Sequence, residues 1–307
     1  MSDEAVFDNS AWAGAEPALS VLIPFKGDDP SPLLALLGRE AVAAEIVVLD
    51  DGSADPGLSA RVAAAAAACP LPVRVVTLAR NVGRAKGRNR LVAHARAPHF
   101  LFLDSDMAPD DAQFLARWLD LIAAESPAVA FGGFSLQQVP PRRDQALHRQ
   151  MAAHSDCLPS AARKLAPEKS LFTSNLLVRR DVFAAEAFDE GFAGWGWEDV
   201  EWGMRVARRW PIVHVDNTAT HLGLDTARTL AAKYEQSAAN FARVVANHPQ
   251  VVSTYPSYRV ALMLKRAPLR GLWRPWLKAF AIAEAAPLAA RAFAMRLYRA
   301  ALYAETV

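Results

Sequence analysis

Apolar runs alternate with helical segments along the first third of the chain. Runs made mostly of Val, Ile, Leu and Phe cover residues 19–24, 45–50, 73–78 and 100–103. Segments with helical spacing or a high alanine content lie between them, at residues 30–44, 58–69 and 87–95. Strands that are apolar on both faces and separated by helices indicate βαβ units on a parallel sheet. The pattern therefore predicts an α/β fold with a mostly parallel central sheet flanked by helices.

The pattern is less regular after residue 110. We expect a helix to about Ala124, a strand over 129–136, and loop or short helices over 137–169, covering the site. Further helices are expected from near Val200 and over 230–248. Residues 1–18 show no periodicity and predict a loose lead-in. These expectations divide the chain into a lead-in at 1–18, an α/β domain at 19–225 with halves at 19–110 and 111–225, and a helical appendage at 226–307.

Composition is compatible with a large folded core. Of the 307 residues, 52% are hydrophobic and 21% are charged, which argues against global disorder. The two cysteines, Cys69 and Cys157, lie too far apart for a metal-ligand pair and fit a reducing compartment. The acidic first residues lack an apolar leader, and the late apolar stretch at 277–295 is interrupted by charges and a proline. We expect a cytoplasmic protein without a signal peptide or membrane span.

Charge is distributed unevenly along the chain. The net charge of +2 combines a tail of +8 over 225–307 with a body of −6. Tryptophan and arginine alternate within residues 260–307, a combination that suits a membrane interface rich in anionic lipid, at the inner face of the cytoplasmic membrane. Packing of the tail on the acidic body and a homodimer contact are the alternatives. No nucleic-acid reader motif is present, so no nucleic-acid partner is expected.

Two carboxylates emerge at the end of the fourth apolar run. Asp104 and Asp106 are spaced i, i+2 around Ser105, so on a strand they face the same side. Together they can hold one hard divalent ion that keeps coordination sites for a phosphate. A plain strand terminus is the competing interpretation of this tripeptide.

Polar residues also follow the other strands. Asp50 and Asp51 end the second run, where they offer acceptors to base N–H groups or ribose hydroxyls, although Asp, Gly and Ser also favour ordinary turns. Lys86 and Arg88 lie in a glycine-spaced basic loop before a helix, which suits phosphates but lacks the Gly-Lys-Ser/Thr core of a P-loop. Since ligands of parallel sheets bind beyond the carboxyl ends of strands, one crevice is expected to collect these groups.

A tryptophan-rich segment follows later in the chain. Trp195 and Trp197 offer flat apolar faces for sugar rings, and Glu198 and Asp199 offer carboxylates for hydroxyl groups. Asp199 is also positioned in sequence to serve as a general base. In the alternative interpretation, the tryptophans are core residues and Asp199 is a helix cap.

Two histidines are candidates for completing a carboxylate site. We favour His221 over His214 as a metal ligand, because His214 lies in an apolar alternation typical of a strand.

These segments, taken in order, resemble the family 2 glycosyltransferases of the GT-A fold. The last segment is similar to a galactosyltransferase-like subgroup that includes polypeptide N-acetylgalactosaminyltransferases and chondroitin-type polymerases. The resemblance spans residues 19 to 225. It is carried by residues 20–24, 47–53, 81–83, 88–89, 102–106, 173–180, 188–192 and 194–199.

The resemblance implies a role for each candidate residue. Asp51, helped by Asp50, would hold the uracil or ribose of a UDP-sugar, and Asp104 and Asp106 would bind the ribose and a Mn²⁺ or Mg²⁺ ion, with His221 as a further ligand. Asp199 would be the catalytic base. The nucleotide pocket would include Pro24, Phe25, Lys86, Arg88 and Ser105, and the sugar and acceptor pocket would include Asn175, Trp195, Trp197 and Glu198.

The resemblance thus implies an inverting, metal-dependent enzyme that moves a sugar from a UDP-sugar to a glycan or lipid-linked acceptor. The region after 225 matches nothing assignable, so the acceptor stays open. Two competing hypotheses are a nucleotidyltransferase on a similar sheet and a non-catalytic sugar- or lipid-binding module. The first would need a glycine-rich phosphate loop after the first strand, where this chain has Pro24 and Phe25 followed by Lys-Gly-Asp.

Overall fold

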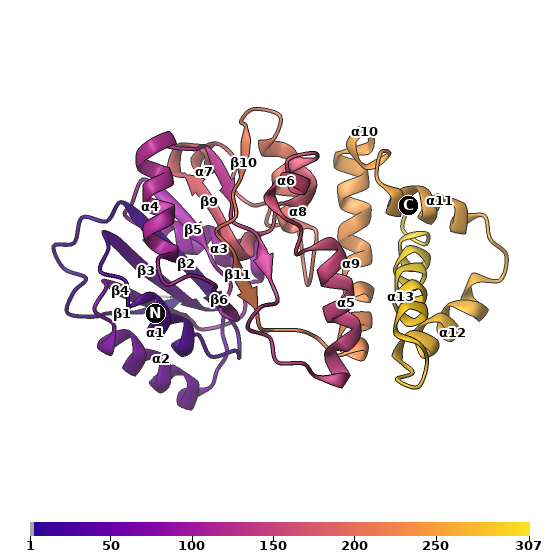
Figure 1. The fold of residues 1–307 in the computed structure, drawn as a ribbon, viewed down its shortest axis with the longest axis horizontal. Helices are drawn as coiled ribbons and strands as arrows, with labels where there is room; N and C mark the ends of the chain where they lie inside the picture. The colour runs from indigo at the N-terminus through magenta and orange to yellow at the C-terminus, as the bar shows by residue number, and fades with distance from the viewer. Residues whose placement is uncertain (1–2) are drawn as a thin grey trace.

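A computed structural model describes residues 3–307, the side chain of Arg270 excepted, and shows a mixed α/β fold followed by helices (Figure 1). In the described residues an eight-stranded sheet has the order β1-β4-β3-β2-β5-β9-β7-β10. Strands β4, β3, β2 and β5 are parallel, whereas β1 and β9 run against their neighbours. The strands are β1 (Glu4–Asp8), β2 (Leu19–Phe25), β3 (Ala44–Asp50), β4 (Val73–Leu78), β5 (His99–Phe102), β7 (Val129–Phe131), β9 (Leu176–Arg179) and β10 (Ile212–His214). The predicted fold class is confirmed.

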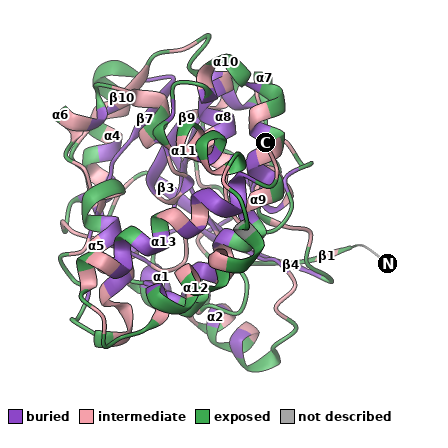
Figure 2. Ribbon diagram, turned by 90° about the vertical axis from the view of Figure 1, so that its right-hand side faces the viewer, coloured by how far each residue is buried: buried purple, intermediate pink, exposed green. Residues whose placement is uncertain are grey.

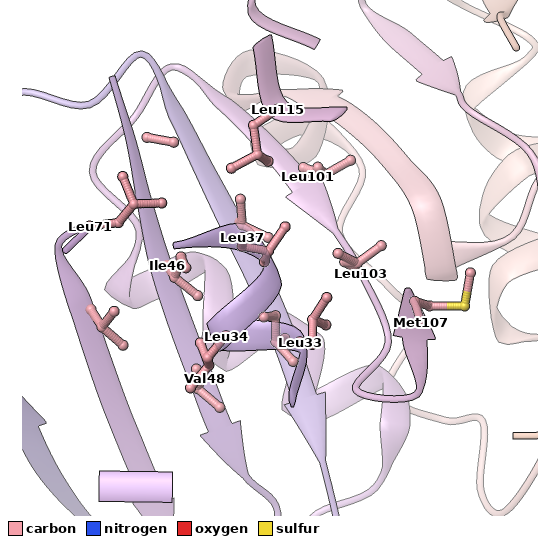
Figure 3. Close-up of a cluster of buried hydrophobic side chains, with 14 of the residues drawn as sticks. Leu33, Leu34, Leu37, Ile46, Val48, Leu71, Leu101, Leu103, Met107 and Leu115 are labelled. Carbon is pink, nitrogen blue, oxygen red and sulfur yellow. The ribbon is translucent and has the colours of Figure 1, made fainter. Parts of the chain in front are cut away.

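Helices cover both faces of this sheet because its central strands are apolar on both sides. One face packs against α1 (Ser31–Leu37), α2 (Pro56–Ala68) and α4 (Phe114–Glu125). Figure 3 shows Leu33, Leu34 and Leu37 of α1 close to Ile46 and Val48 of β3. The other face packs against α3 (Arg84–His94), α7 (Arg180–Ala185) and α8 (Glu198–Val206). This double cover leaves the carboxyl ends of the parallel strands as the edge where polar groups gather.

A second, small sheet lies beside the main one. In the part of the chain that the structure describes it has the order β6-β11-β8, with β6 (Met107–Pro109), β8 (Phe134–Ser135) and β11 (Ala219–His221). The single strand expected over 129–136 is therefore wrong, because the chain divides into β7 and β8 at Gly132 and Gly133. Gly133 has a φ of 92°, a left-handed conformation that ends β7 and redirects the chain.

One other expected element has different bounds, and the segment expected as a loop or short helices is now defined. The helix expected over 30–44 ends at Leu37. The segment 137–169 contains a ten-residue helix, α5 (Ala146–Ser155), besides α6 (Ser160–Arg163) and the 3₁₀ turns η1 (Arg143–Gln145) and η2 (Pro167–Ser170). A further 3₁₀ turn, η3 (Thr173–Asn175), precedes β9.

The segment expected to be a loose lead-in is ordered from residue 3 on. Strand β1 pairs with β4, and the buried Asn9 amide nitrogen donates to the carbonyls of Ala66, Cys69 and Leu71. The Asn9 side-chain oxygen accepts from the Val73 amide at 3.0 Å. The sequence did not reveal this strand because β1 is an edge strand that leaves apolar residues exposed, so no inward–outward alternation results.

The last third of the chain is helical. It comprises α9 (Ala227–Asn247), α10 (Pro249–Val252), α11 (Pro256–Lys265), α12 (Arg270–Ile282) and α13 (Leu288–Tyr303). Helix α9 lies between α5 and α13, and α11 and α12 are outermost (Figure 1). Figure 2 shows the buried faces of α9 and α13 and the exposed positions of α11 and α12. Among the described residues, no helix combines the length and apolarity needed to cross a membrane.

These helices share a core with the α/β part. One hydrophobic cluster joins Leu147 of α5, Phe192 and Met204 to residues of α9, α11, α12 and α13. Several basic residues of the tail point inward: Arg291 donates to the Ala281 carbonyl, and Lys278 pairs with Glu235 of α9 at 2.6 Å. Division of the chain at residue 225 stays a prediction, and the core crosses that position.

Candidate active site

A cavity of about 380 Å³ lies at the carboxyl ends of β2, β3 and β5, next to the N-terminus of α3. Strand ends and a helix N-terminus thus meet here, as in nucleotide-binding α/β folds. The cavity collects most of the acids and bases that follow the strands in sequence. Its lining is Pro24, Phe25, Lys26, Asp28, Asp51, Asn81, Gly83, Arg84, Gly87, Arg88, Asp104, Ser105, Asp106 and Gly194.

Asp106 lines this cavity and pairs with His221, which is not among the lining residues. The Asp106 Oδ2 and His221 Nε2 atoms are 3.2 Å apart. The pair is fixed by the small sheet, because β6 starts directly after Asp106 and pairs His221 with Met107. The Leu222 amide also donates to the Asp106 carbonyl at 2.9 Å. A Cβ on Gly223 would lie 1.9 Å from Asp106 Oδ2, so a glycine is what leaves room for this carboxylate.

Asp104 is engaged by protein donors instead. Its Oδ1 accepts from Arg88 at 2.9 Å, and its Oδ2 accepts from the Ser174 hydroxyl at 2.6 Å. Burial alone would raise the pKa of Asp104, but Arg88, Arg84 and Ser174 hold it at about 2. The carboxylate is therefore ionised and orients Arg88; its predicted role as a metal ligand stays a prediction.

Two arginines of α3 connect the cavity to the tryptophan-rich segment. Arg84 Nε donates to Glu198 Oε1 at 2.7 Å, and Arg88 Nη1 contacts the same oxygen at 3.3 Å. Glu198 and Arg88 are both buried. A buried carboxylate shared by two guanidinium groups is a stable arrangement only as a unit, since removal of one partner leaves a buried charge unpaired.

Asp199 lies next to this pair, at the start of α8. Burial and then the adjacent Glu198 charge raise the pKa of Asp199 to about 7, against the opposing effect of Arg88. Its Oδ1 accepts from the Val200 amide at 2.8 Å, but the N-cap of α8 is Trp197, so Asp199 is not the helix cap. A carboxyl group with a pKa near neutrality is suited to accept a proton in a reaction near pH 7.

The backbone before α8 is unusual. Gly194, Gly196 and Trp197 have φ values of 72°, 90° and 77°. Trp197 is thus a non-glycine residue in the left-handed region, where it is held by its side chain: Nε1 donates to the Tyr303 hydroxyl at 3.0 Å, and the ring packs on Phe241. Helix α13 therefore supports the turn that presents Glu198 and Asp199.

The acids at the end of β3 have local structural bonds. Asp51 accepts from the amides of Val82 and Gly83 at 2.7 and 3.1 Å, which fixes the loop before α3 while the carboxylate lines the cavity. Asp50 accepts from the Ser53 amide and is buried in the turn.

Several predicted site residues lie outside the cavity lining. Lys86 points toward Glu190, 3.8 Å away, and Arg84 lines the cavity instead, because the first turn of α3 faces inward at positions 84, 87 and 88. Asn175 is buried and donates to the carbonyls of Gly133 and Asn217. The other predicted site residues absent from the lining are Asp50, Trp195, Trp197, Glu198, Asp199 and His221.

In the tryptophan-rich segment, some residues are core residues and one stays a candidate for sugar contact. Trp197 packs into the helical core, and Glu198 is saturated by arginines, so neither side chain is presented to a sugar in this structure. Trp195 is half-buried against Tyr234, with Lys233 near its ring. It stays a candidate for sugar contact.

His214 lies in a strand, as its pattern predicted, and the choice of His221 as a metal ligand stays a prediction. His214 is buried in β10 and contacts the Pro167 carbonyl, a structural role. Sequence reasoning missed His148 of α5, whose ring lies 6.1 Å from that of His221. Its Nδ1 accepts from the Asp225 amide, and burial lowers its pKa to about 4, so the ring is neutral. No sequence spacing connects His148 to the strand ends, so the contact could be found only from the fold.

The donors of this site fit a divalent ion. Among the described residues, no group of three or more His, Cys, Asp and Glu forms a complete metal site. However, two cis ligands of one octahedral ion at ~2.1 Å are about 3 Å apart, close to the Asp106–His221 separation of 3.2 Å. Burial and the Asp106 charge also raise the pKa of Asp28, which shows that negative charge is concentrated here. An ion held by these two side chains alone would keep positions for diphosphate oxygens.

Comparison with known proteins agrees with this fold. The mostly parallel sheet with polar strand ends defines a GT-A-like glycosyltransferase fold. The family described as glycosyl transferase family 2 matches residues 20–184, and the chain belongs to this family. A search of curated proteins found no match.

Three solved structures share the fold at low identity. A mannosyltransferase, PcManGT from Pyrobaculum calidifontis in complex with GDP-Man and Mn²⁺, has a TM-score of 0.62 and 14% identity, over 97% of this chain and 89% of that one. Residues 1–349 of TarS from S. aureus have a TM-score of 0.53 and 16% identity, over 94% and 89% of the two chains. Glucosyl-3-phosphoglycerate synthase from Mycobacterium tuberculosis in complex with phosphoglyceric acid has a TM-score of 0.52 and 18% identity, over 78% and 81%.

Proposed function

We propose that this glycosyltransferase moves a hexose or N-acetylhexosamine from a UDP-sugar to a hydroxyl group, with inversion and with the help of Mn²⁺ or Mg²⁺. The observation that carries the proposal is a cavity of about 380 Å³ lined by Arg84, Arg88 and Asp106, with His221 paired to Asp106 behind the lining. The mannosyltransferase with a similar fold is described with a nucleotide sugar and Mn²⁺, which supports this class of donor and ion.

The nucleotide would lie along the strand ends. Asp51, with Asp50 behind it, would accept hydrogen bonds from uracil or ribose, and Pro24 and Phe25 would contact the base. Asp104 and Ser105 would lie at the ribose. Arg84 and Arg88 would place positive charge near the diphosphate, with Arg84 taking the part predicted for Lys86.

Asp106 and His221 would hold the ion, which when bound would stabilise negative charge on the departing UDP. Asp199 would accept the proton of the acceptor hydroxyl as that oxygen attacks the anomeric carbon from the side opposite the departing UDP. The raised pKa of Asp199, about 7, supports this role because a weakly acidic carboxyl group is a better base than an ordinary one.

The acceptor we propose is a glycan or lipid-linked glycan of the cell envelope, as in polysaccharide, lipopolysaccharide or glycolipid synthesis. This would place the enzyme in the cytoplasm, at the inner face of the membrane. The basic tail supports that assignment through its charge of +8.

UDP release from a panel of sugar nucleotides, with and without Mn²⁺, tests the proposal. The panel includes GDP-mannose, and glycan and lipid-linked acceptors are offered. We expect turnover with a UDP-sugar, loss of it in Asp106→Ala, and retention in Asp120→Ala, a matched change of an exposed carboxylate on α4. Preference for GDP-mannose would refute the choice of UDP. Release of pyrophosphate would favour a nucleotidyltransferase, and binding of a sugar nucleotide without turnover a non-catalytic module.

A further inference from the structure

The outer face of α12 is apolar and uncovered. Leu269, Leu272, Trp276 and Phe280 are 70%, 67%, 76% and 45% exposed. They follow one another at helical spacing, so they form one ridge along the outside of the helix. We call these four residues the apolar ridge. The other exposed positions between 272 and 280 are Pro275 and Ala279, so no polar side chain interrupts it.

The opposite face of α12 fixes the helix to the rest of the protein. Ala281 is buried and Leu277 packs against the helical core. Lys278 pairs with Glu235 of α9, and Arg274 pairs with Glu305. The ridge is therefore held outward by a helix anchored on its other side, at the outermost part of the molecule (Figures 1 and 2).

The segment that carries the ridge is basic, although Arg274 and Lys278 on its anchored face are paired with Glu305 and Glu235. Residues 256–283, which span α11 and α12, contain six basic residues and no acidic one. Lys265 and Arg266 are exposed at the end of α11, just before the ridge. A second copy of the chain meeting this face symmetrically would bring the two basic segments together, which electrostatic repulsion disfavours.

We propose that the apolar ridge is a docking surface for an anionic lipid bilayer. Apolar side chains of an interfacial helix enter the headgroup–acyl boundary, where an indole ring is favoured, and basic side chains beside them attract anionic headgroups. The apolar ridge supplies the apolar side chains, and the basic α11–α12 segment supplies the basic ones. This inference does not rest on the donor chemistry, since it concerns a face outside the cavity.

The test is sedimentation of the full chain with vesicles of phosphatidylcholine alone or of an equal mixture of phosphatidylcholine and phosphatidylglycerol. We expect binding to the mixed vesicles that weakens at high salt. The double change Leu272→Ser and Trp276→Ser should weaken it about a hundredfold or more, since burial of each such side chain contributes about a decade in affinity or more. Leu165→Ser, which removes a leucine that is 87% exposed outside the ridge, should leave binding unchanged.

Two controls keep the result interpretable. Thermal unfolding and UDP binding of the double variant should match the parent, which separates loss of docking from loss of fold or of donor binding. Equal sedimentation of parent and double variant, or no binding of the parent to mixed vesicles, would overturn the proposal. Concentration-dependent dimers that disappear in the double variant would also overturn it and assign the ridge to a second copy.

Discussion

Replacement of Gly223 by alanine tests the geometry of the Asp106–His221 pair. Gly223 does not have a positive φ, so its backbone accepts alanine without strain. The new Cβ would lie 1.9 Å from Asp106 Oδ2 and 2.8 Å from its Cγ, distances that no stable packing allows. Because the clash is with the end of a side chain, the carboxylate would turn away from His221 and the fold would stay intact.

The size of the effect follows from the required displacement. Relief of the clash moves the carboxylate by on the order of 1 Å, whereas metal-ligand distances tolerate about 0.2 Å. Misplacement by ~1 Å costs about a hundredfold in a positioned site, or about 2.7 kcal/mol. We therefore expect Gly223→Ala to weaken Mn²⁺-dependent UDP binding and turnover by about two orders of magnitude.

Calorimetric titration of UDP with and without Mn²⁺ measures this loss, together with a melting curve. Gly271→Ala is the matched control, since a Cβ there meets nothing within 4 Å. Unchanged Mn²⁺-dependent UDP binding in Gly223→Ala would refute the assignment of Asp106 to the metal. A large drop in melting temperature would refute the argument that the clash is confined to one side chain.

Three further predictions concern the base, its support and the N-terminal strand. Asp199 must be ionised to act as a base, and its pKa is raised to about 7, so the rate should increase with pH through an apparent pKa near 7. In Asp199→Asn the pH–rate profile should lose this rise, and the rate should be about 10²–10⁴-fold lower. Tyr303→Phe removes the hydrogen bond to Trp197. In steady-state kinetics it should lower kcat more than it alters KM for the donor, and it should lower the free energy of unfolding by about 1 kcal/mol. An unchanged kcat would contradict the proposal that α13 supports the turn carrying Asp199. Asn9→Ala leaves buried carbonyls without donors and should cost about 1–3 kcal/mol in denaturant unfolding, an effect that a loose lead-in would not show.

The four parallel strands β2, β3, β4 and β5 could be predicted because they are mostly apolar. Residues 73–78, for example, form β4 with the predicted bounds. The strand-end acids were found for the same reason, since each follows directly on such a run. The division of 129–136 between two sheets was not predictable from periodicity, because both halves are apolar and only the conformation of Gly133 separates them.

The errors at the site arise from long-range partners. Lys86 and Arg84 are equivalent in sequence, and only the orientation of α3 toward Glu198, 114 positions later, selects Arg84. Trp197 has the composition of a sugar-binding residue, but Tyr303, 106 positions away, determines that it packs inward. Composition therefore predicted which segments form the site, and packing decided which side chains face the cavity.

The packing of Trp197 against α9 and α13 has a consequence for how this family member can vary. The turn before α8 and the helical tail depend on each other, because a different tail would have to supply its own contacts for the Trp197 ring and an acceptor for its Nε1 donor. Exchange of tails by recombination would therefore disturb the turn that carries Asp199. New acceptor preferences in this lineage are expected to arise by paired substitutions on both sides of residue 225, visible as covariation between the turn and α13.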